Sequence, residues 1–265
     1  MSSPRKLKTY VIALPEAADR RRFMEVQLKS FPFMDWEFVD GVRGKDLSPE
    51  EMVRAVDQEQ CRRTTGRTLS LAEVGSTLAH FEVMRRIEKA KDQVALVLED
   101  DPLISGNFTR MVWQIAAEFQ PDRPRIILLT PCKYFRSTGH MINGDFALRR
   151  FYEGFYASGY FINYEAARLI PPALLPLRAH VDWWKLTREI SGVAIDAIVP
   201  YCVGISISEN TASFINPSTS GGAGNKAAQT QDKESVLAPI LKFGGRVRRG
   251  IYERALGIRG QRLIF

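Results

Sequence analysis

The sequence predicts an α/β fold with a mainly parallel or mixed central sheet flanked by helices. Short apolar segments typical of buried strands alternate along the chain with longer segments that carry helix signals. One of the apolar segments, residues 94–98, leads directly into three adjacent acidic residues. A strand buried on both faces has such a continuous apolar run, and it delivers the residues that follow it to the carboxyl edge of the sheet. The pattern therefore puts an acidic cluster where α/β proteins bind ligands.

The remaining elements follow in order along the chain. We expect strands at residues 10–14, 36–39, 94–98, 125–129, 160–163 and 197–207, and helices at 20–29, after Ser48, after Ser70 and at 164–170. Ser48 precedes Pro49, and Ser70 stands three residues before Glu73, which are typical cap and first-turn residues. Pro171 and the proline after it are expected to end the last helix.

The composition indicates one globular unit. A chain of 265 residues with 45% hydrophobic residues can bury a large core. Every apolar stretch is shorter than the roughly 18 residues that a membrane span needs, and the run at residues 10–14 is too short for a signal peptide. We therefore expect a cytoplasmic protein, at most peripheral at the inner face of the cytoplasmic membrane. The three cysteines, Cys61, Cys132 and Cys202, lack a C-x-x-C pair and are expected to be buried thiols.

The acidic cluster is a candidate metal site. Glu99 and Asp101 are two residues apart, and in an extended segment they would point to the same side and could share Mn²⁺ or Mg²⁺. Like charges this close repel one another unless a positive charge compensates them. The alternative is a solvated acidic turn closed by Pro102.

Four segments carry a family resemblance. They read L-E-D-D at 98–101, L-S-L-A-E-V-G-S-T-L-A-H at 69–80, Y-V-I-A-L at 10–14 with V-D-G at 39–41, and A-S-G-Y-F-I at 157–162 with V-D-W-W at 181–184. Together they resemble glycosyltransferase family 25, the lipopolysaccharide and lipooligosaccharide transferases, over roughly residues 8–210. The chain departs from the family pattern at Ala13, Ser76 and Ala79, which removes no carboxylate.

The resemblance implies a GT-A-like catalytic domain over residues 1–215. It also implies a metal-dependent, inverting transfer of a hexose, with galactose favoured, from a UDP-sugar to a lipopolysaccharide or another cell-surface glycan, which can be lipid-linked. In GT-A transferases the loop after the first strand and the acid after the second strand hold the nucleotide. The donor-binding candidates are Leu14, Pro15, Arg20, Asp40, His80 and Asp100.

Two of the candidates have plain structural alternatives. His80 lies beside an apolar stripe of the helix after Ser70, where a core histidine is as well accommodated as a ligand contact. Glu73 is seven residues before His80 and could share a face with it, but the capping box with Ser70 alone can account for Glu73.

Asp182 is the candidate catalytic residue. An inverting transfer needs a base that takes the proton of the acceptor hydroxyl, and Asp182 lies apart from the metal cluster. Trp183 and Trp184 offer flat apolar faces for the acceptor sugar; the alternative is two core tryptophans beside a capping aspartate. His180 is a possible further metal or phosphate contact, and the third protein ligand of the metal stays unassigned.

The C-terminal part has a different composition. Residues 216–235 are rich in small and polar residues, and a flexible loop or linker is expected there. Residues 236–265 form a basic amphipathic segment, expected to contact an anionic membrane surface or a lipid-linked acceptor; a solvated terminal helix is the alternative. Nucleic acid is not an expected partner because aromatic residues are sparse there. The basic residues of the segment 236–265, from residue 240 onward, are Lys242, Arg246, Arg248, Arg249, Arg254, Arg259 and Arg262.

Two other functions use the same features. A nucleotidyl or phosphoryl transferase could employ the same acidic metal site. A relative without turnover could bind nucleotide-sugars or glycans.

Overall fold

The computed structural model describes residues 6–205 and 258–260. Within this part a nine-stranded sheet has the order β11-β6-β7-β9-β5-β8-β3-β1-β2, and β10 and β4 form a separate two-stranded sheet. The strands are β1 (Leu7–Ala13), β2 (Met34–Asp40), β3 (Val94–Leu98), β4 (Pro102–Ile104), β5 (Arg125–Leu128), β6 (Tyr134–Met141), β7 (Ala147–Glu153), β8 (Gly159–Asn163), β9 (Ala194–Val199), β10 (Val203–Ile205) and β11 (Ile258–Gly260). The helices are α1 (Ala18–Leu28), η1 (Gly44–Asp46), α2 (Pro49–Ala55), α3 (Gln58–Thr65), α4 (Leu71–Ala90), α5 (Phe108–Ala117), α6 (Tyr164–Leu174) and α7 (Trp184–Ser191).

The large sheet is mixed, which confirms the predicted α/β class. Strand β1 runs parallel to both β2 and β3, so the carboxyl ends of these three strands meet at one edge. Strand β8 is antiparallel to β3 and β5, and β9 is parallel to β5. The loops that follow β1, β2 and β3 are thereby brought together.

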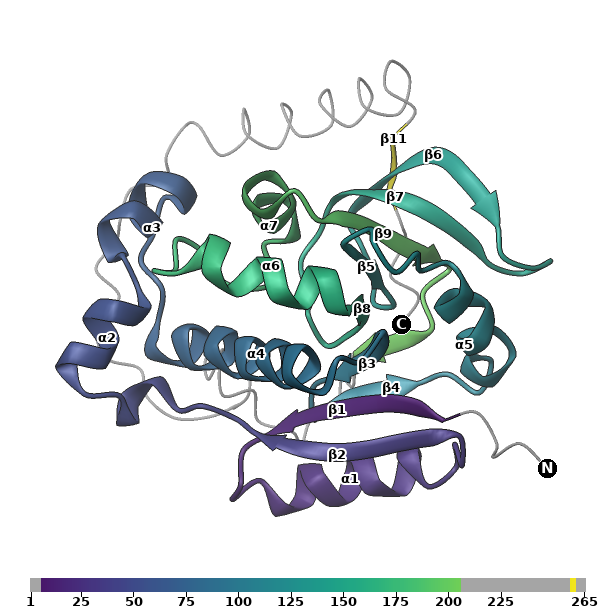
Figure 1. Ribbon diagram of the computed structural model, residues 1–265, viewed down its shortest axis with the longest axis horizontal. Helices are drawn as coiled ribbons and strands as arrows, with labels where there is room; N and C mark the ends of the chain where they lie inside the picture. Colours follow the sequence, from purple (N-terminus) through teal and green to yellow (C-terminus); the bar gives the residue numbers. More distant parts are fainter. Residues whose placement is uncertain (1–5, 206–257, 261–265) are drawn as a thin grey trace, which may run out of the picture.

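Helices cover both faces of the sheet (Figure 1). In β3, Ala95 and Val97 belong to the core that includes α4 and α6, whereas Leu96 and Leu98 belong to the core that includes α1 and α5. All four side chains are fully buried. The continuous apolar run is therefore the signature of a strand with a hydrophobic core on each face.

Helix α4 begins at the predicted capping box. The Ser70 side chain accepts a hydrogen bond from the Glu73 amide, and the Glu73 carboxylate accepts one from the Ser70 amide. A Cβ atom added to Gly75 would lie 2.2 Å from the carbonyl oxygen of Val42. This glycine therefore allows the loop after β2 to pack directly on α4.

Helices α3, α5 and α7 were not predicted, and three further features differ from the predicted elements. Helix α6 continues through Pro171 and the next proline to Leu174, because Ile170 and Leu174 bury one face of the helix and offset the backbone hydrogen bonds lost at the prolines. The strand expected at 197–207 is split at Pro200 into β9 and β10. The β6–β7 hairpin was missed because β6 is largely polar and exposed, with no apolar alternation.

The predictions for the C-terminal part fall largely outside the described residues. This holds for the linker at 216–235 and for all of 236–265 except β11, which pairs antiparallel with β6. Among the described helices, none has the length and apolar character needed to cross a membrane. The three cysteines are buried free thiols, as expected.

Candidate functional site

A cavity of about 570 Å³ opens at the carboxyl edge shared by β1, β2 and β3, and its size is typical of small-molecule sites. Four carboxylates and three cationic side chains line it, so it combines opposite charges in one concave site. The lining residues are Ile12, Ala13, Leu14, Glu16, Arg20, Gly41, Val42, Arg43, Gly44, Lys45, Leu71, Ala72, Ser76, Ala79, Glu99, Asp100 and Asp101. Five of the residues predicted from the sequence are in this set: Leu14, Arg20, Glu99, Asp100 and Asp101.

Arg20 connects α1 to the acidic cluster. Its Nη1 donates to Asp100 Oδ1 at 2.6 Å and lies 3.7 Å from Asp101 Oδ2. Burial raises the pKa of the Asp100 carboxyl, although the Arg20 guanidinium opposes this rise. Burial and the charges of Glu99 and Asp100 raise the pKa of Asp101 to about 7. The other oxygen of Asp101, Oδ1, is buried and has no hydrogen-bond partner.

Glu99 is oriented differently from the prediction. The chain bends at Asp100 and Asp101, so Glu99 and Asp101 are not alternate residues of an extended strand. Glu99 Oε1 lies 3.2 Å from His80 Nε2, and Glu99 Oε2 accepts a hydrogen bond of 2.7 Å from Ser158 Oγ. Burial favours the neutral acid, but the contacts with His80 and Ser158 outweigh it and lower the pKa of Glu99. The inference that extended geometry aligns Glu99 with Asp101 was therefore wrong.

His80 is a fully buried side chain of α4 and does not line the cavity. Its Nδ1 lies 2.9 Å from the Tyr160 hydroxyl, and its ring stacks on the Tyr160 ring at a centroid distance of 5.7 Å. This position agrees with the core alternative. His80 can still act on the site because its second ring nitrogen contacts Glu99.

Asp40 and Pro15 lie outside the lining of the cavity. The Asp40 carboxylate pairs with Arg21, whose guanidinium also donates to the carbonyl oxygens of Ala13 and Leu14 at 3.0 and 3.1 Å. Arg21 thus ties the loop after β1 to the end of β2. The structure brings Leu14, and not the side chain of Asp40, to the cavity.

The sequence reasoning missed two cations of the cavity, Arg43 and Lys45. Both belong to the segment around η1, and Arg43 forms an ion pair with Glu16. Two basic residues directly after the V-D-G segment were the available signal. Their proximity to the acidic cluster depends on the packing of this segment against α4 at Gly75.

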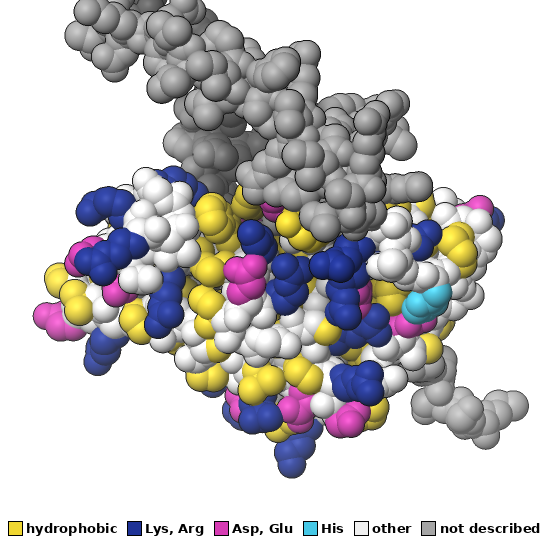
Figure 2. All heavy atoms as spheres, turned by 90° about the horizontal axis from the view of Figure 1, so that it is seen from above, with side chains coloured by type: hydrophobic (Ala, Val, Ile, Leu, Met, Phe, Trp, Pro, Cys, Tyr) yellow, Lys and Arg dark blue, Asp and Glu magenta, His cyan; other side chains and the backbone are white. Residues whose placement is uncertain are grey.

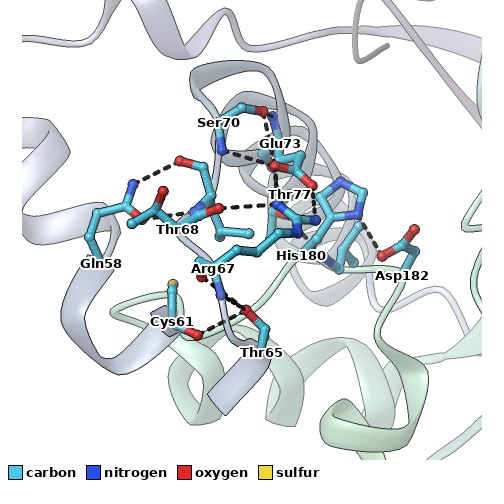
Figure 3. A network of polar contacts seen from close by, with 12 residues as sticks. Gln58, Cys61, Thr65, Arg67, Thr68, Ser70, Glu73, Thr77, His180 and Asp182 are labelled. Atoms are coloured by element: carbon cyan, nitrogen blue, oxygen red, sulfur yellow. Dashed lines mark hydrogen bonds and ion pairs between the residues drawn. The ribbon is translucent and has the colours of Figure 1, made fainter. Parts of the chain in front are cut away.

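A second polar cluster contains Asp182 and His180 (Figure 3). Asp182 Oδ1 lies 2.7 Å from His180 Nδ1, and the amide of Val181 donates to Thr77 Oγ1 of α4. Burial lowers the pKa of His180, but Asp182, together with the charges of Glu99 and Glu73, raises it more strongly. The Nε2 atom of His180 is buried and has no hydrogen-bond partner. Asp182 is 24% exposed and does not line the cavity at the ends of β1, β2 and β3.

The two tryptophans after Asp182 lie in different environments. Trp184 is fully buried, and its Nε1 donates to the carbonyl oxygen of Tyr156 at 2.9 Å. Trp184 therefore has no face available to an acceptor, and its predicted role was wrong because this side chain fills the core. Trp183 is partly exposed, and the centroid of its ring lies 5.8 Å from the centroid of the Phe155 ring.

Within the described ranges, no group of three or more His, Cys, Asp and Glu side chains is arranged to hold a metal ion. The Mn²⁺ or Mg²⁺ site stays a prediction, and its third protein ligand stays unassigned.

The part of the chain that matches a known family contains the cavity. A family model described as "Glycosyltransferase family 25 (LPS biosynthesis protein)" matches residues 6–183, which contain all the lining residues. A protein of Acanthamoeba polyphaga mimivirus, named "Putative glycosyltransferase R655", is 26% identical over 140 residues. The aligned region covers 52% of this chain and 39% of the mimivirus protein. Because the family model covers more than half of the chain, this protein belongs to glycosyltransferase family 25.

Proposed function

We propose that this protein is a metal-dependent, inverting hexosyltransferase that uses a UDP-sugar, with UDP-galactose favoured. Its acceptor would be a lipopolysaccharide or another cell-surface glycan. The observation that carries the proposal is the cavity at the carboxyl edge of β1, β2 and β3, where the acidic cluster faces Arg43 and Lys45. The family supports glycosyl transfer, and the charges of the cavity support a donor that contains a diphosphate.

The cavity offers separate contacts for the parts of such a donor. Leu14 and Gly41 lie at the ends of adjacent parallel strands and would hold the nucleoside, since ligands bind at this edge in α/β sheets. Arg43 and Lys45 would pair with phosphate oxygens, and Arg43 would exchange its ion pair with Glu16, which is more exposed than the pair of Arg20 with Asp100. Arg20 is already paired with Asp100, so its main effect is to position the acidic cluster.

The acidic cluster fits a divalent cation. Asp101 has a buried oxygen without a hydrogen-bond partner, and its carboxyl is crowded by two other acids. Carboxylate oxygens are the ligands that Mn²⁺ and Mg²⁺ prefer, and these ions commonly complete their shell with phosphate oxygens and water. Asp101 would hold the ion, with Glu99 as the nearby second carboxylate. When bound, the ion would neutralise charge on the departing diphosphate.

We assign proton transfer to Asp182. Its carboxylate would take the proton of the acceptor hydroxyl as that oxygen attacks the anomeric carbon. His180 holds Asp182 through the 2.7 Å contact, and the partial exposure of Asp182 leaves it accessible to an acceptor. Glu99 would stay in place through Ser158 and His80.

Calorimetry with Asp101→Asn tests the donor site. We expect the wild-type protein to bind UDP-galactose in Mn²⁺ and to lose affinity in chelator, and the variant to bind equally weakly in both. Asp122→Asn, at an exposed position in the loop before β5, is the matched control and should behave as wild type. Equal Mn²⁺-dependent affinity in Asp101→Asn would refute the metal site. The released product distinguishes the alternatives: UDP for glycosyl transfer, pyrophosphate or phosphate for the other transferases, and none for a binding protein.

We also propose that the basic C-terminal segment binds an anionic membrane surface at the cytoplasmic face. Figure 2 shows Lys and Arg side chains on the face seen from above, with acidic and hydrophobic side chains between them. Replacing Arg246, Arg248 and Arg249 together by Gln preserves β11, whereas a truncation would remove it. At about 1 kcal/mol per basic residue, this triple variant should bind anionic liposomes about 100-fold more weakly at low salt. Unchanged cosedimentation would reject the membrane proposal.

A further inference from the structure

The loop between β7 and β8 holds a tyrosine in an unusual backbone conformation. Tyr156 has a φ angle of 94°, a region that residues with a side chain rarely adopt. The other non-glycine residue with positive φ in the described ranges is Lys91, which ends α4 as a left-handed cap. Tyr156 has no such capping role, so its conformation has to be explained by its surroundings.

Two fully buried side chains hold the Tyr156 backbone. Its carbonyl oxygen accepts hydrogen bonds from Trp184 Nε1 at 2.9 Å and from Thr130 Oγ1 at 3.3 Å. Trp184 begins α7, and Thr130 follows β5. Since both donors come from the rigid core, the conformation of Tyr156 is imposed by the tertiary structure.

The held loop presents aromatic rings on the surface. Phe155 and Tyr156 are each 40% exposed, although their neighbours Gly154 and Ala157 are buried. The Phe155 ring contacts Trp183 with an interplanar angle of 59°. We call Phe155, Tyr156 and Trp183 the aromatic platform. Exposing adjacent large aromatic residues forgoes their burial, which is typical of binding surfaces.

The aromatic platform is connected to the acidic cluster. Ser158, two residues after Tyr156, donates through Oγ to Glu99, and its carbonyl oxygen accepts from the Glu99 amide at 3.1 Å. Asp182 precedes Trp183 directly in the chain. The platform is therefore two residues from Ser158, which holds Glu99 at the wall of the cavity, and one residue from the proposed base.

We propose that the aromatic platform binds a sugar ring of the glycan acceptor; this inference rests on the proposed function. The apolar face of a pyranose carries C–H groups that pack on aromatic rings, while its hydroxyl groups stay available to Asp182. A ligand on the platform would lie near Glu99 and would stay outside the donor cavity. An acceptor has to bind in this way, because the sugar donor occupies the cavity. Trp184 and Thr130 are positioning residues, since they fix the loop and have no exposed surface of their own.

Saturation-transfer NMR on the full chain tests binding without a donor. The probes are methyl galactoside, methyl glucoside and core oligosaccharide released from lipopolysaccharide by mild acid. We expect transfer from aromatic protons to one face of a sugar ring, and binding about five- to tenfold weaker in Phe155→Ala and in Tyr156→Gly. Glycine accepts a φ of 94° freely, so Tyr156→Gly removes the ring without straining the fold. Met141→Ala, an exposed apolar residue at the end of β6, is the control and should bind as wild type.

The result separates this inference from the proposed function. Binding of UDP-galactose in the presence of Mn²⁺, measured by thermal shift, tests the donor site. This binding should be the same in all these variants. The aromatic platform is refuted if none of the probes binds, or if both variants bind them as wild type does. It is also refuted if the variants lose binding to anionic liposomes and keep binding to the sugars, because the rings would then serve a membrane surface.

Discussion

Replacing Glu73 by Gln separates the two roles of this side chain. The Glu73 carboxylate accepts the capping hydrogen bond of Ser70 and also two hydrogen bonds from the Arg67 guanidinium, at 2.9 and 2.5 Å. Glutamine retains an acceptor for the capping box and removes the negative charge. The substitution therefore tests the ion pair with Arg67 while leaving the cap of α4 in place.

The lowered pKa of Glu73 gives the size of the expected loss in stability. Burial raises this pKa, but Arg67 and Ser70 lower it more strongly, to about 2 from the ordinary value of 4.5. At about 1.4 kcal/mol per pKa unit, the full difference corresponds to about 3 kcal/mol. Arg67 is 51% exposed, so water screens its charge, and we expect a loss of about 1–2 kcal/mol in the free energy of unfolding at pH 5.

The loss in stability on replacing Glu73 should depend on pH in a defined direction. A carboxyl whose pKa is lowered on folding stabilises the protein above its unfolded pKa, and this contribution is lost as the pH falls through the folded pKa. The difference between wild type and Glu73→Gln should therefore be full at pH 5 and should shrink from pH 4.5 toward pH 2. Since Glu73 also raises the pKa of His180, the comparison is made at pH 5 and below, where that histidine is protonated in the native wild-type protein.

Urea unfolding of the full chain at several pH values measures this difference. Glu51→Gln is a matched control, because Glu51 completes the capping box of α2 but is exposed and forms no ion pair with an arginine among the described residues. The pKa of Glu51 is also lowered, mainly by its hydrogen bonds with Ser48, but Glu51 is exposed, so we expect the control to show a smaller change than Glu73→Gln at each of these pH values. A loss in Glu73→Gln that stays constant from pH 5 to pH 3 would refute the reasoning, since it would come from the cap or from packing.

Three further predictions concern packing and catalysis. Gly75→Ala should lower the free energy of unfolding by about 3 kcal/mol, since its Cβ would meet backbone atoms at 2.2 Å; Gly106→Ala, with no atom within 4 Å of its Cβ, should leave urea unfolding unchanged, and equal stability of both variants would contradict this. Trp184→Phe removes the hydrogen bond from Trp184 Nε1 to the carbonyl oxygen of Tyr156, so it should lower the free energy of unfolding, measured by thermal unfolding, by about 2 kcal/mol. It should also raise the KM for the acceptor without changing the KM for the sugar donor, and a change in the KM for the sugar donor alone would contradict this role. Asp182→Asn should lower kcat by about 10² to 10⁴ at unchanged donor affinity, and near-normal turnover in a product assay would make Asp182 a structural residue.

Patterns that act over a few residues were predictable from the sequence. The apolar run at 94–98 indicated a strand buried on both faces, and the serines at 48 and 70 indicated the starts of α2 and α4. These features depend on apolar runs, caps and nearest neighbours, which the sequence contains directly. Five of the predicted residues line one cavity because β1, β2 and β3 are parallel and end at the same edge.

Other features depend on contacts between distant segments, which only the tertiary structure decided. Glu99 turns to His80 and Ser158, 19 and 59 residues away in the chain, so its direction could not follow from the spacing to Asp101. Two adjacent tryptophans look equivalent in the sequence, yet the start of α7 buries Trp184 and leaves Trp183 partly exposed. The sequence by itself determined the family, the α/β class and the strand that carries the acidic cluster, because these follow from local patterns and motifs. The partners of each charged group, the backbone of Tyr156 and the aromatic platform were decided by packing, since burial and hydrogen bonding depend on which elements the fold brings together.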